Sequence, residues 1–224
     1  LQDNRSALYQ GTTAWYKTFF GDGMCCGVNS QNDNICYTEY TNGSINRSNN
    51  RGLSWSSISG GLSGTFAFVT PFIVCRSNPS VLYIAGSSIF KSTIGGGSWS
   101  NLGSLGYNAL SMDASATSTD TVYVGVIPVA ANQPAIIYRS TNGTSFTNIS
   151  GVQLPSRYPT DLHVNPNNSA DVYVTMGGFG SGHVYRSTNA GVTWNNISGN
   201  LPDVPHQSIV IDPMFPQNVY VGND

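Results

Sequence analysis

The chain has 224 residues, of which 9% are Asp, Glu, Lys or Arg and 39% are hydrophobic. An average soluble protein has roughly 25% charged residues, and disordered chains combine high charge with few aromatic residues. The composition therefore favours short strands with many polar turns. A net charge of -2 and a pI near 5.8 offer no field that would attract nucleic acid or an anionic membrane. No apolar run approaches the roughly 18 residues of a membrane helix, so we expect no membrane insertion.

An internal repeat of about 45 residues runs along the chain, and a period of this length points to a propeller or an array. Each copy has a turn rich in Ser, Asn and Gly, followed by an aromatic residue. These aromatic residues are Trp55, Trp99, Phe146 and Trp194, and Trp15 ends a decayed further copy. A tyrosine within an apolar segment recurs with the same period, at Tyr37, Tyr83, Tyr123, Tyr173 and Tyr220.

In chain order, each repeat reads as four short strands joined by turns. SIVIDP is typical of the first strand, VYVG of the second and YRS of the end of the third, and Thr-Trp opens the fourth. Alternation, β-branched residues and bounding turn residues favour strands. No segment has convincing helical periodicity, and residues 108–120 are expected to form a strand and a turn. Four strands per repeat make one propeller blade.

We therefore predict an all-β fold, a β-propeller of four-stranded antiparallel blades. The full blades are expected at residues 21–60, 66–103, 107–150 and 157–199. Residues 1–20 supply only an outer half blade, and residues 203–224 supply only an inner half blade. Either the chain is part of a larger propeller, or the two halves combine and close a five-bladed ring.

The repeated turns resemble the Asp-box, or BNR repeat, of a family of β-propellers, which has the pattern Ser-x-Asp/Asn-x-Gly-x-Ser/Thr-Trp. Ile94 replaces the Asp or Asn in one copy, and the copy that ends in Phe146 is one residue short. The matching residues are Ser48, Asn50, Gly52 and Trp55; Ser92, Gly96 and Trp99; Ser140, Asn142 and Phe146; and Ser187, Asn189, Gly191 and Trp194.

These box residues have a structural explanation. A short Asn side chain bonds backbone N–H groups nearby, and Gly supplies positive φ. The aromatic residue is expected to pack between adjacent blades. Chelation of structural calcium by the boxes is the less favoured alternative, and we expect no cofactor.

Two shorter strings, LQDN at the first residues and GDGM at Gly21–Met24, resemble the sortilin-like and xyloglucanase-like branch of these propellers. That resemblance implies secreted carbohydrate-active enzymes, sorting receptors or adhesins. These proteins share the fold and not a function.

Four cysteines lie in the first third of the chain, at Cys25, Cys26, Cys36 and Cys75. None has the spacing of a zinc site. We predict two structural disulfides, one within a repeat and one between neighbouring repeats, with buried free thiols as the alternative. Disulfides would place the protein in an extracellular, cell-surface or periplasmic compartment.

Seven Asn-x-Ser/Thr sequons make glycosylation a candidate modification. A chain this rich in Asn, Ser and Thr would contain roughly five by chance, so the support is weak. The candidate asparagines are Asn4, Asn42, Asn46, Asn142, Asn148, Asn167 and Asn196.

The arginines do not favour a sialidase, which needs three of them converging on a carboxylate. Arg47, Arg139 and Arg186 share one position in the repeat, and Arg51 lies within a box turn. All four therefore have a structural explanation.

A glycoside hydrolase needs two carboxylic acids across a cleft. Asp22, Asp161 and Asp203 are weak catalytic candidates, because each is expected near a ring face. The simpler interpretation of each is a turn or strand-end carboxylate, as for Asp212. The three histidines, His163, His183 and His206, show no metal-binding spacing, so we expect no metal site.

The preferred hypothesis is a secreted or cell-surface, non-catalytic propeller that binds an extracellular protein or a glycan through loops on one ring face. The alternative is a fragment of an Asp-box glycoside hydrolase, xyloglucanase-like or sialidase-like, with some catalytic residues in absent blades. Aromatic candidates for the binding surface are Trp15, Tyr107, Tyr158, Phe179 and Phe215.

Overall fold

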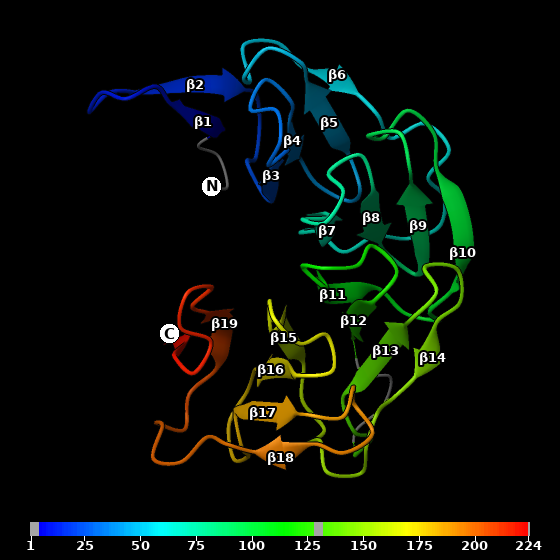
Figure 1. Ribbon diagram of the computed structural model, residues 1–224, viewed down its shortest axis with the longest axis vertical. Helices are drawn as coiled ribbons and strands as arrows, with labels where there is room; N and C mark the ends of the chain where they lie inside the picture. Colours follow the sequence, from blue (N-terminus) through cyan, green and yellow to red (C-terminus); the bar gives the residue numbers. More distant parts are fainter. Residues whose placement is uncertain (1–4, 128–131, 224) are drawn as a thin grey trace.

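The structure is a computed structural model that describes residues 5–127 and 132–223, and these residues form strands and no helix. Four sheets have four antiparallel strands each, and two sheets have two strands each. The predicted set of four full blades and two half blades is therefore confirmed (Figure 1).

Every full blade uses its strands in chain order. The N-terminal half blade consists of β1 (Ser6–Tyr9) and β2 (Trp15–Phe19). The first full blade consists of β3 (Cys26–Val28), β4 (Cys36–Glu39), β5 (Ile45–Ser48) and β6 (Ser56–Ser57). The second consists of β7 (Phe72–Val74), β8 (Leu82–Ala85), β9 (Ser88–Ser92) and β10 (Ser100–Ser104).

The same order continues in the second part of the chain. The third full blade consists of β11 (Ala109–Ala114), β12 (Val122–Val126), β13 (Ile136–Ser140) and β14 (Thr147–Asn148). The fourth consists of β15 (Pro159–Val164), β16 (Val172–Met176), β17 (Val184–Ser187) and β18 (Asn195–Asn196). The C-terminal half blade consists of β19 (His206–Ile211) and β20 (Val219–Asn223).

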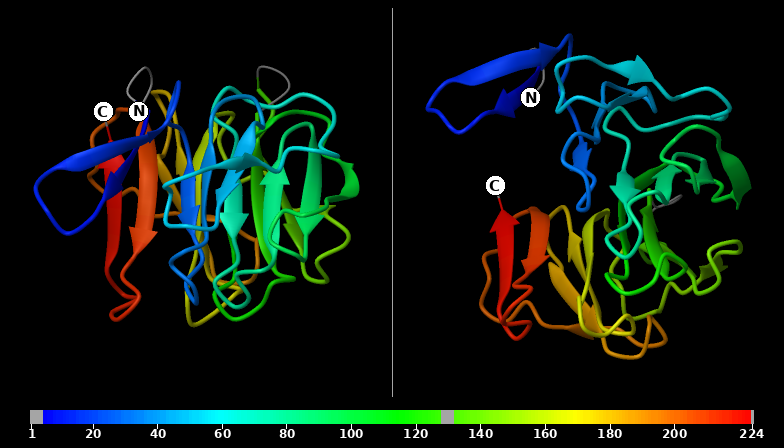
Figure 2. Two further views of the ribbon diagram at one scale, coloured as in Figure 1. Left: turned by 90° about the horizontal axis from the view of Figure 1, so that it is seen from above. Right: turned by 45° about the horizontal axis from the view of Figure 1, so that its top comes forward.

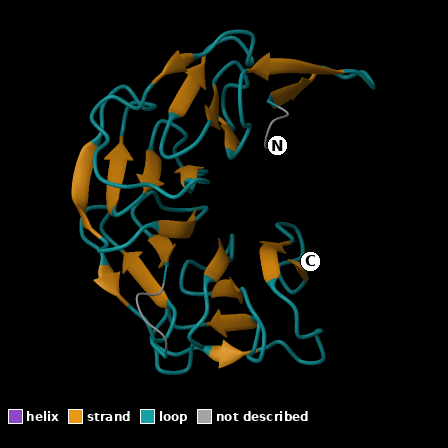
Figure 3. Cartoon of the chain, turned by 180° about the vertical axis from the view of Figure 1, so that it is seen from behind, coloured by secondary structure: helices purple, strands orange, loops and turns teal. Residues whose placement is uncertain are grey.

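The blades follow one another around an arc. The first strands of the blades lie toward its centre and the fourth strands toward its outside (Figure 1). Among the described residues, the two half blades are separate sheets, and they lie on either side of an opening. The structure therefore does not show a five-bladed ring closed by pairing of the two halves. Seen from behind, the same arc consists of strands and loops throughout (Figure 3).

The strands run between two faces of the arc, which are its upper and lower borders in the left view of Figure 2. One face carries the links between blades and the links from second to third strands, and we call it the loop face. The other carries the links from first to second strands and the box turns, at residues 48–55, 92–99, 140–146 and 187–194, and we call it the box face. This division follows from the antiparallel order of each blade.

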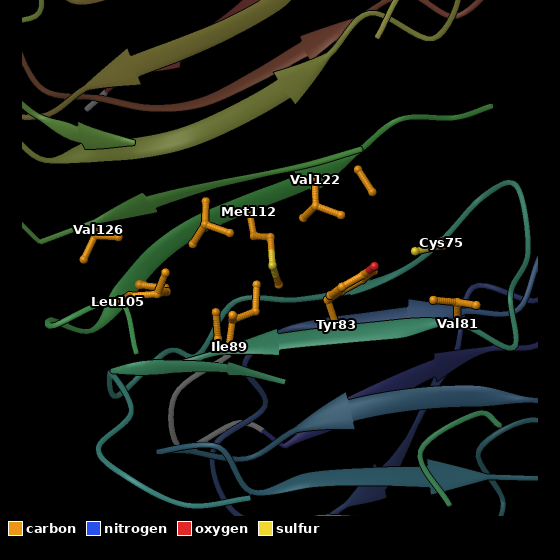
Figure 4. Packing of buried hydrophobic residues seen from close by; sticks show 12 residues of the cluster. Cys75, Val81, Tyr83, Ile89, Leu105, Met112, Val122 and Val126 are labelled. Atoms are coloured by element: carbon orange, nitrogen blue, oxygen red, sulfur yellow. The ribbon is translucent and has the colours of Figure 1, made fainter. Parts of the chain in front are cut away.

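The hydrophobic core lies between neighbouring blades. Tyr83 and Ile89 of the second full blade pack against Met112 and Val122 of the third (Figure 4). Tyr83 and Val122 are fully buried. Burial of apolar surface is worth roughly 25 cal/mol per Å², so sheet-to-sheet packing holds the arc together.

The box turns have the expected hydrogen bonds. The Ser187 hydroxyl accepts the Gly191 N–H at 2.8 Å, and the Asn189 side chain accepts the Thr193 N–H at 2.9 Å. The indole N–H of Trp194 donates to the Ile149 carbonyl of the preceding blade link. The box aromatic residues thus connect adjacent blades.

All four cysteines are free thiols in the structure, so neither predicted disulfide is present in it. Across the strand pair β3–β4, Cys36 lies opposite Val28, not opposite Cys26. Cys25 packs against the core cluster between the first two full blades, whereas Cys75 belongs to the next cluster.

Burial also corrects one of the proposed glycosylation sites. Asn46 is 7% exposed and its side chain donates to the Ser44 carbonyl, so this residue has no room for a glycan. Asn4 lies outside the described residues. The remaining candidates are exposed and stay predictions: Asn42, Asn142, Asn148, Asn167 and Asn196.

Candidate functional site

The box face is occupied by contacts between blades. The Tyr83 hydroxyl donates to the Thr119 carbonyl of the next blade, and the Tyr123 hydroxyl donates to the Ser169 carbonyl, each at 2.8 Å. The tyrosine repeat seen in the sequence therefore has a structural role.

Five basic side chains of the box face also have hydrogen-bond or ion-pair partners. Pairs that join a cation to a carbonyl or a carboxylate on that face are Arg47 with Gly95, Arg139 with Ala190, Arg51 with Asp33, Lys91 with Asp120, and Arg186 with Asp171. This set includes the four arginines that the sequence assigned to structure. They are not arranged to receive a substrate carboxylate.

The loop face, by contrast, exposes aromatic side chains along its length. Tyr158 is 52% exposed and Phe179 is 59% exposed. Other exposed aromatic residues in links on this face are Phe20, Tyr40, Phe68 and Tyr107. Of the aromatic candidates from the sequence, Phe215 is exposed in the link between β19 and β20 on the box face, and Trp15 is exposed at the start of β2.

Side chains from two other links hold the link 177–182 between β16 and β17, which we call the glycine loop. Arg157 donates from Nε to the Phe179 carbonyl at 3.0 Å, and from Nη1 to the Ser156 carbonyl at 2.8 Å. From the other side, the Asp203 Oδ1 atom accepts the Gly180 N–H at 2.8 Å. The loop thus holds the Phe179 ring in solvent on a backbone that is tied at two points.

Two stacked histidines lie behind the glycine loop. His183 Nε2 is 2.9 Å from Asp203 Oδ1, and the His183 ring stacks on His206 with centroids 4.9 Å apart. Both imidazoles are buried. The Gly180 N–H, and secondarily His183, lower the pKa of Asp203 below its usual value, so this exposed carboxylate is ionised at neutral pH.

A second cluster of polar side chains lies on the inner strands, near the centre of the arc. The Asp161 Oδ2 atom accepts the Ile209 N–H of the next blade at 2.9 Å, and Oδ1 accepts the Leu162 N–H. Burial raises the pKa of Asp161 and lowers that of His163. The two side chains influence each other electrostatically.

Asp113 belongs to the same inner group. It accepts the Val164 N–H of the next blade and lies 3.9 Å from His163 and 4.0 Å from Arg76. Burial raises the pKa of Asp113 to about 6. A carboxylate that joins two strands is poorly placed to move a proton to a substrate, so the inner acids are best explained as links between blades.

The candidate acids do not share one site. Asp203 is on the loop face, Asp161 is on inner strand β15, and Asp22 is half-buried in the link before β3. Within the described residues, no group of three or more His, Cys, Asp or Glu side chains could hold a metal ion. No helix in that part of the chain is long and apolar enough to span a membrane.

Sequence reasoning missed Glu39, the last residue of β4 and the only glutamate in the chain. Its side chain is fully buried, and burial raises its pKa to about 7, with Thr70 offsetting part of the effect. The signal was the position of Glu39 within a predicted strand, since charged residues are rarely fully buried unless paired.

No family model and no curated protein matches the sequence. Solved structures do match the fold. An ancestral GH74 enzyme has a TM-score of 0.69 and 17% identity, over 86% of this chain and 26% of that one. The GH74 enzyme of Niastella koreensis has a TM-score of 0.66 and 24% identity, over 89% of this chain and 33% of that one. A structure of YCF48 bound to D1 peptide has a TM-score of 0.61 and 14% identity, over 94% of this chain and 66% of that one.

These comparisons define the class of fold. The chain is an all-β protein with the fold of a β-propeller. It spans about a quarter to a third of the length of the two GH74 enzymes. At sequence identities below 25%, structural similarity shows a shared fold and not a shared function.

Proposed function

We propose that the chain is a non-catalytic β-propeller scaffold, secreted or at a cell surface, that binds a protein or glycan partner through its loop face. The observation that carries the proposal is the contrast between the two faces. Basic side chains of the box face, such as Arg47 and Arg139, are used in bonds between blades, whereas the loop face presents Tyr158 and Phe179 to solvent.

The glycine loop supports a binding role because it is organised in advance. Two side chains from different links, Arg157 and Asp203, fix its backbone, so little conformational entropy remains to be lost when Phe179 meets a partner. Exposed aromatic residues are enriched among those that dominate binding energy. The likeness to a YCF48 structure that contains a bound peptide supports a protein segment as the first partner to test.

A relationship to Asp-box propellers belongs to the same proposal. It is supported by hydrogen bonds within the box turns. The Ser48 hydroxyl accepts the Gly52 N–H, and the Asn50 side-chain oxygen accepts the Ser54 N–H.

The alternative, a fragment of a glycoside hydrolase, has less support. The GH74 structures favour it only through the fold. Both oxygens of Asp161 accept backbone N–H groups, and Asp203 is tied to Gly180 and His183. A hydrolysis assay with xyloglucan oligosaccharides and a sialoside, on wild type and on Asp22→Asn, Asp161→Asn and Asp203→Asn, tests it directly.

The binding proposal is tested by selecting peptides from a random library displayed on phage against the whole chain. Selected peptides are then measured on a Tyr158→Ala/Phe179→Ala variant. We expect about a tenfold or greater loss of affinity, which corresponds to 1.4 kcal/mol or more.

A matched control removes exposed apolar side chains from the box face, with Leu53→Ala/Val192→Ala, because these residues are both 69% exposed. We expect this variant to keep full affinity. Equal binding by the loop-face variant, or loss only in the box-face variant, would contradict the proposal.

A further inference from the structure

Two cysteines share one face of the paired strands β3 and β4. Cys26 lies opposite Thr38, and Cys36 lies opposite Val28. Partners across a strand pair and residues two positions apart point to the same face. Cys26 and Cys36 are therefore diagonal neighbours, with Cα atoms roughly 7–8 Å apart by strand geometry.

Both thiols border open space. Cys26 is exposed and lines a cavity of about 590 Å³ together with Arg5 and Lys17. Cys36 is half-buried and lines a cavity of about 530 Å³ that includes Arg51. A narrower cavity of about 130 Å³ is lined by both cysteines. A small molecule can thus approach Cys26 and leave room for Cys36 to reach the same sulfur.

The other two cysteines are poor candidates for reaction. Burial raises the pKa of Cys25 to about 11 and that of Cys75 to about 12. Both also pack against hydrophobic clusters between blades. The thiolate is the reactive form, and reactive cysteines sit in electropositive, accessible surroundings. Cys26 is exposed and lines the same cavity as Arg5 and Lys17, so it is the more accessible thiol.

We propose that Cys26 and Cys36 form a thiol–disulfide exchange site for a small disulfide that carries carboxylates, such as oxidised glutathione. The Cys26 thiolate attacks one sulfur of the disulfide, forms a mixed disulfide and releases one thiolate. The Cys36 thiolate then attacks the Cys26 sulfur, forms the Cys26–Cys36 disulfide and releases the second thiolate. Two protein thiols are oxidised, and one small disulfide is reduced to two thiols.

The second step requires a shift of β3 toward Cys36. A disulfide needs Cα atoms within about 6.8 Å, so the strand has to move by roughly 1 Å. β3 has three residues and is an edge strand of its sheet, paired only with β4. Burial raises the pKa of Cys36, with a bond to Ser48 opposing the effect, so this step is slow at neutral pH and accelerates as pH rises.

The experiment treats the reduced, whole chain with oxidised glutathione, blocks remaining thiols with N-ethylmaleimide at intervals, and maps adducts by mass spectrometry. In wild type we expect a glutathione adduct at Cys26 that gives way to a Cys26–Cys36 disulfide. Cys36→Ser should stop at the Cys26 adduct, and Cys26→Ser should block both products. Cys36→Ala serves the same purpose if the serine variant does not fold.

Controls separate site chemistry from general reactivity. Cys25→Ser should leave the sequence of products unchanged. Arg5→Gln/Lys17→Gln should slow the glutathione step several-fold, roughly the effect of removing two nearby charges, without slowing reaction with neutral hydroxyethyl disulfide. A first adduct at Cys25, Cys36 or Cys75, or a wild-type adduct as persistent as that of Cys36→Ser, would overturn the proposal.

Discussion

The Asp113 carboxylate of β11 accepts the backbone N–H of Val164 in the next blade at 2.8 Å. Val164 is buried, so removing the acceptor leaves its N–H without a partner. We expect Asp113→Ala to lower the free energy of unfolding by about 2 kcal/mol, measured by urea denaturation at pH 7.

The control for this prediction is Asp33→Ala, which breaks an exposed ion pair with Arg51 on the box face. Exposed pairs contribute about 0–1 kcal/mol. If Asp113→Ala costs no more than Asp33→Ala, the contact between blades is not stabilising.

Glu39 should make stability depend on pH. Its pKa is raised from 4.5 to about 7 by burial, so the folded state binds the proton more tightly than the unfolded state does. The contribution is fully present below pH 4.5 and is lost as pH rises through 7, by at most about 3 kcal/mol at 1.36 kcal/mol per pKa unit. Glu39→Gln should therefore gain stability relative to wild type between pH 5 and pH 8 in urea denaturation. A difference that does not change with pH would show that Glu39 does not titrate in this range.

The fold was predictable because the same pattern of strands and turns recurs in each repeat. The boxes, as at Ser48 and Ser187, and the tyrosines, as at Tyr123 and Tyr173, are two series with one period, and strand positions followed from them. The state of the cysteines was not predictable, since it depends on which residue lies opposite Cys36 across a strand pair. Spacing in the sequence does not define that register.

The candidate site was predictable only in part. Exposed aromatic residues could be named because loops carry them. The role of Asp161 could not, because its partner Ile209 lies 48 residues away on another blade. Likewise, Arg157 and Asp203 are 46 positions apart in the chain, and only the fold brings both to the glycine loop.

Ile94 offers a stabilising substitution. It occupies the box position held by Asn50 and Asn189, and its side chain is 59% exposed. At those positions the Asn oxygen accepts the N–H of Ser54 or Thr193. We expect Ile94→Asn to form the equivalent bond with Ser98 and to raise the free energy of unfolding by about 1 kcal/mol. Ile94→Ala is the control, and an equal change in both variants would assign the effect to loss of exposed isoleucine.

The last prediction concerns the shape of the glycine loop. Gly178 has φ of 86°, and a Cβ atom added there would lie 2.8 Å from the Cδ atom of Arg157. Gly178→Ala should therefore combine backbone strain of about 1–2 kcal/mol with displacement of Arg157 from the Phe179 carbonyl. Gly199→Ala is the matched control, because Gly199 has φ of 55° and no atom within 4 Å of the added Cβ. Both variants should lose stability in urea, but only Gly178→Ala should speed hydrogen exchange of the Gly180 amide, which the loop otherwise holds on Asp203. Unchanged exchange in Gly178→Ala would mean that the loop keeps its shape without the Arg157 contact.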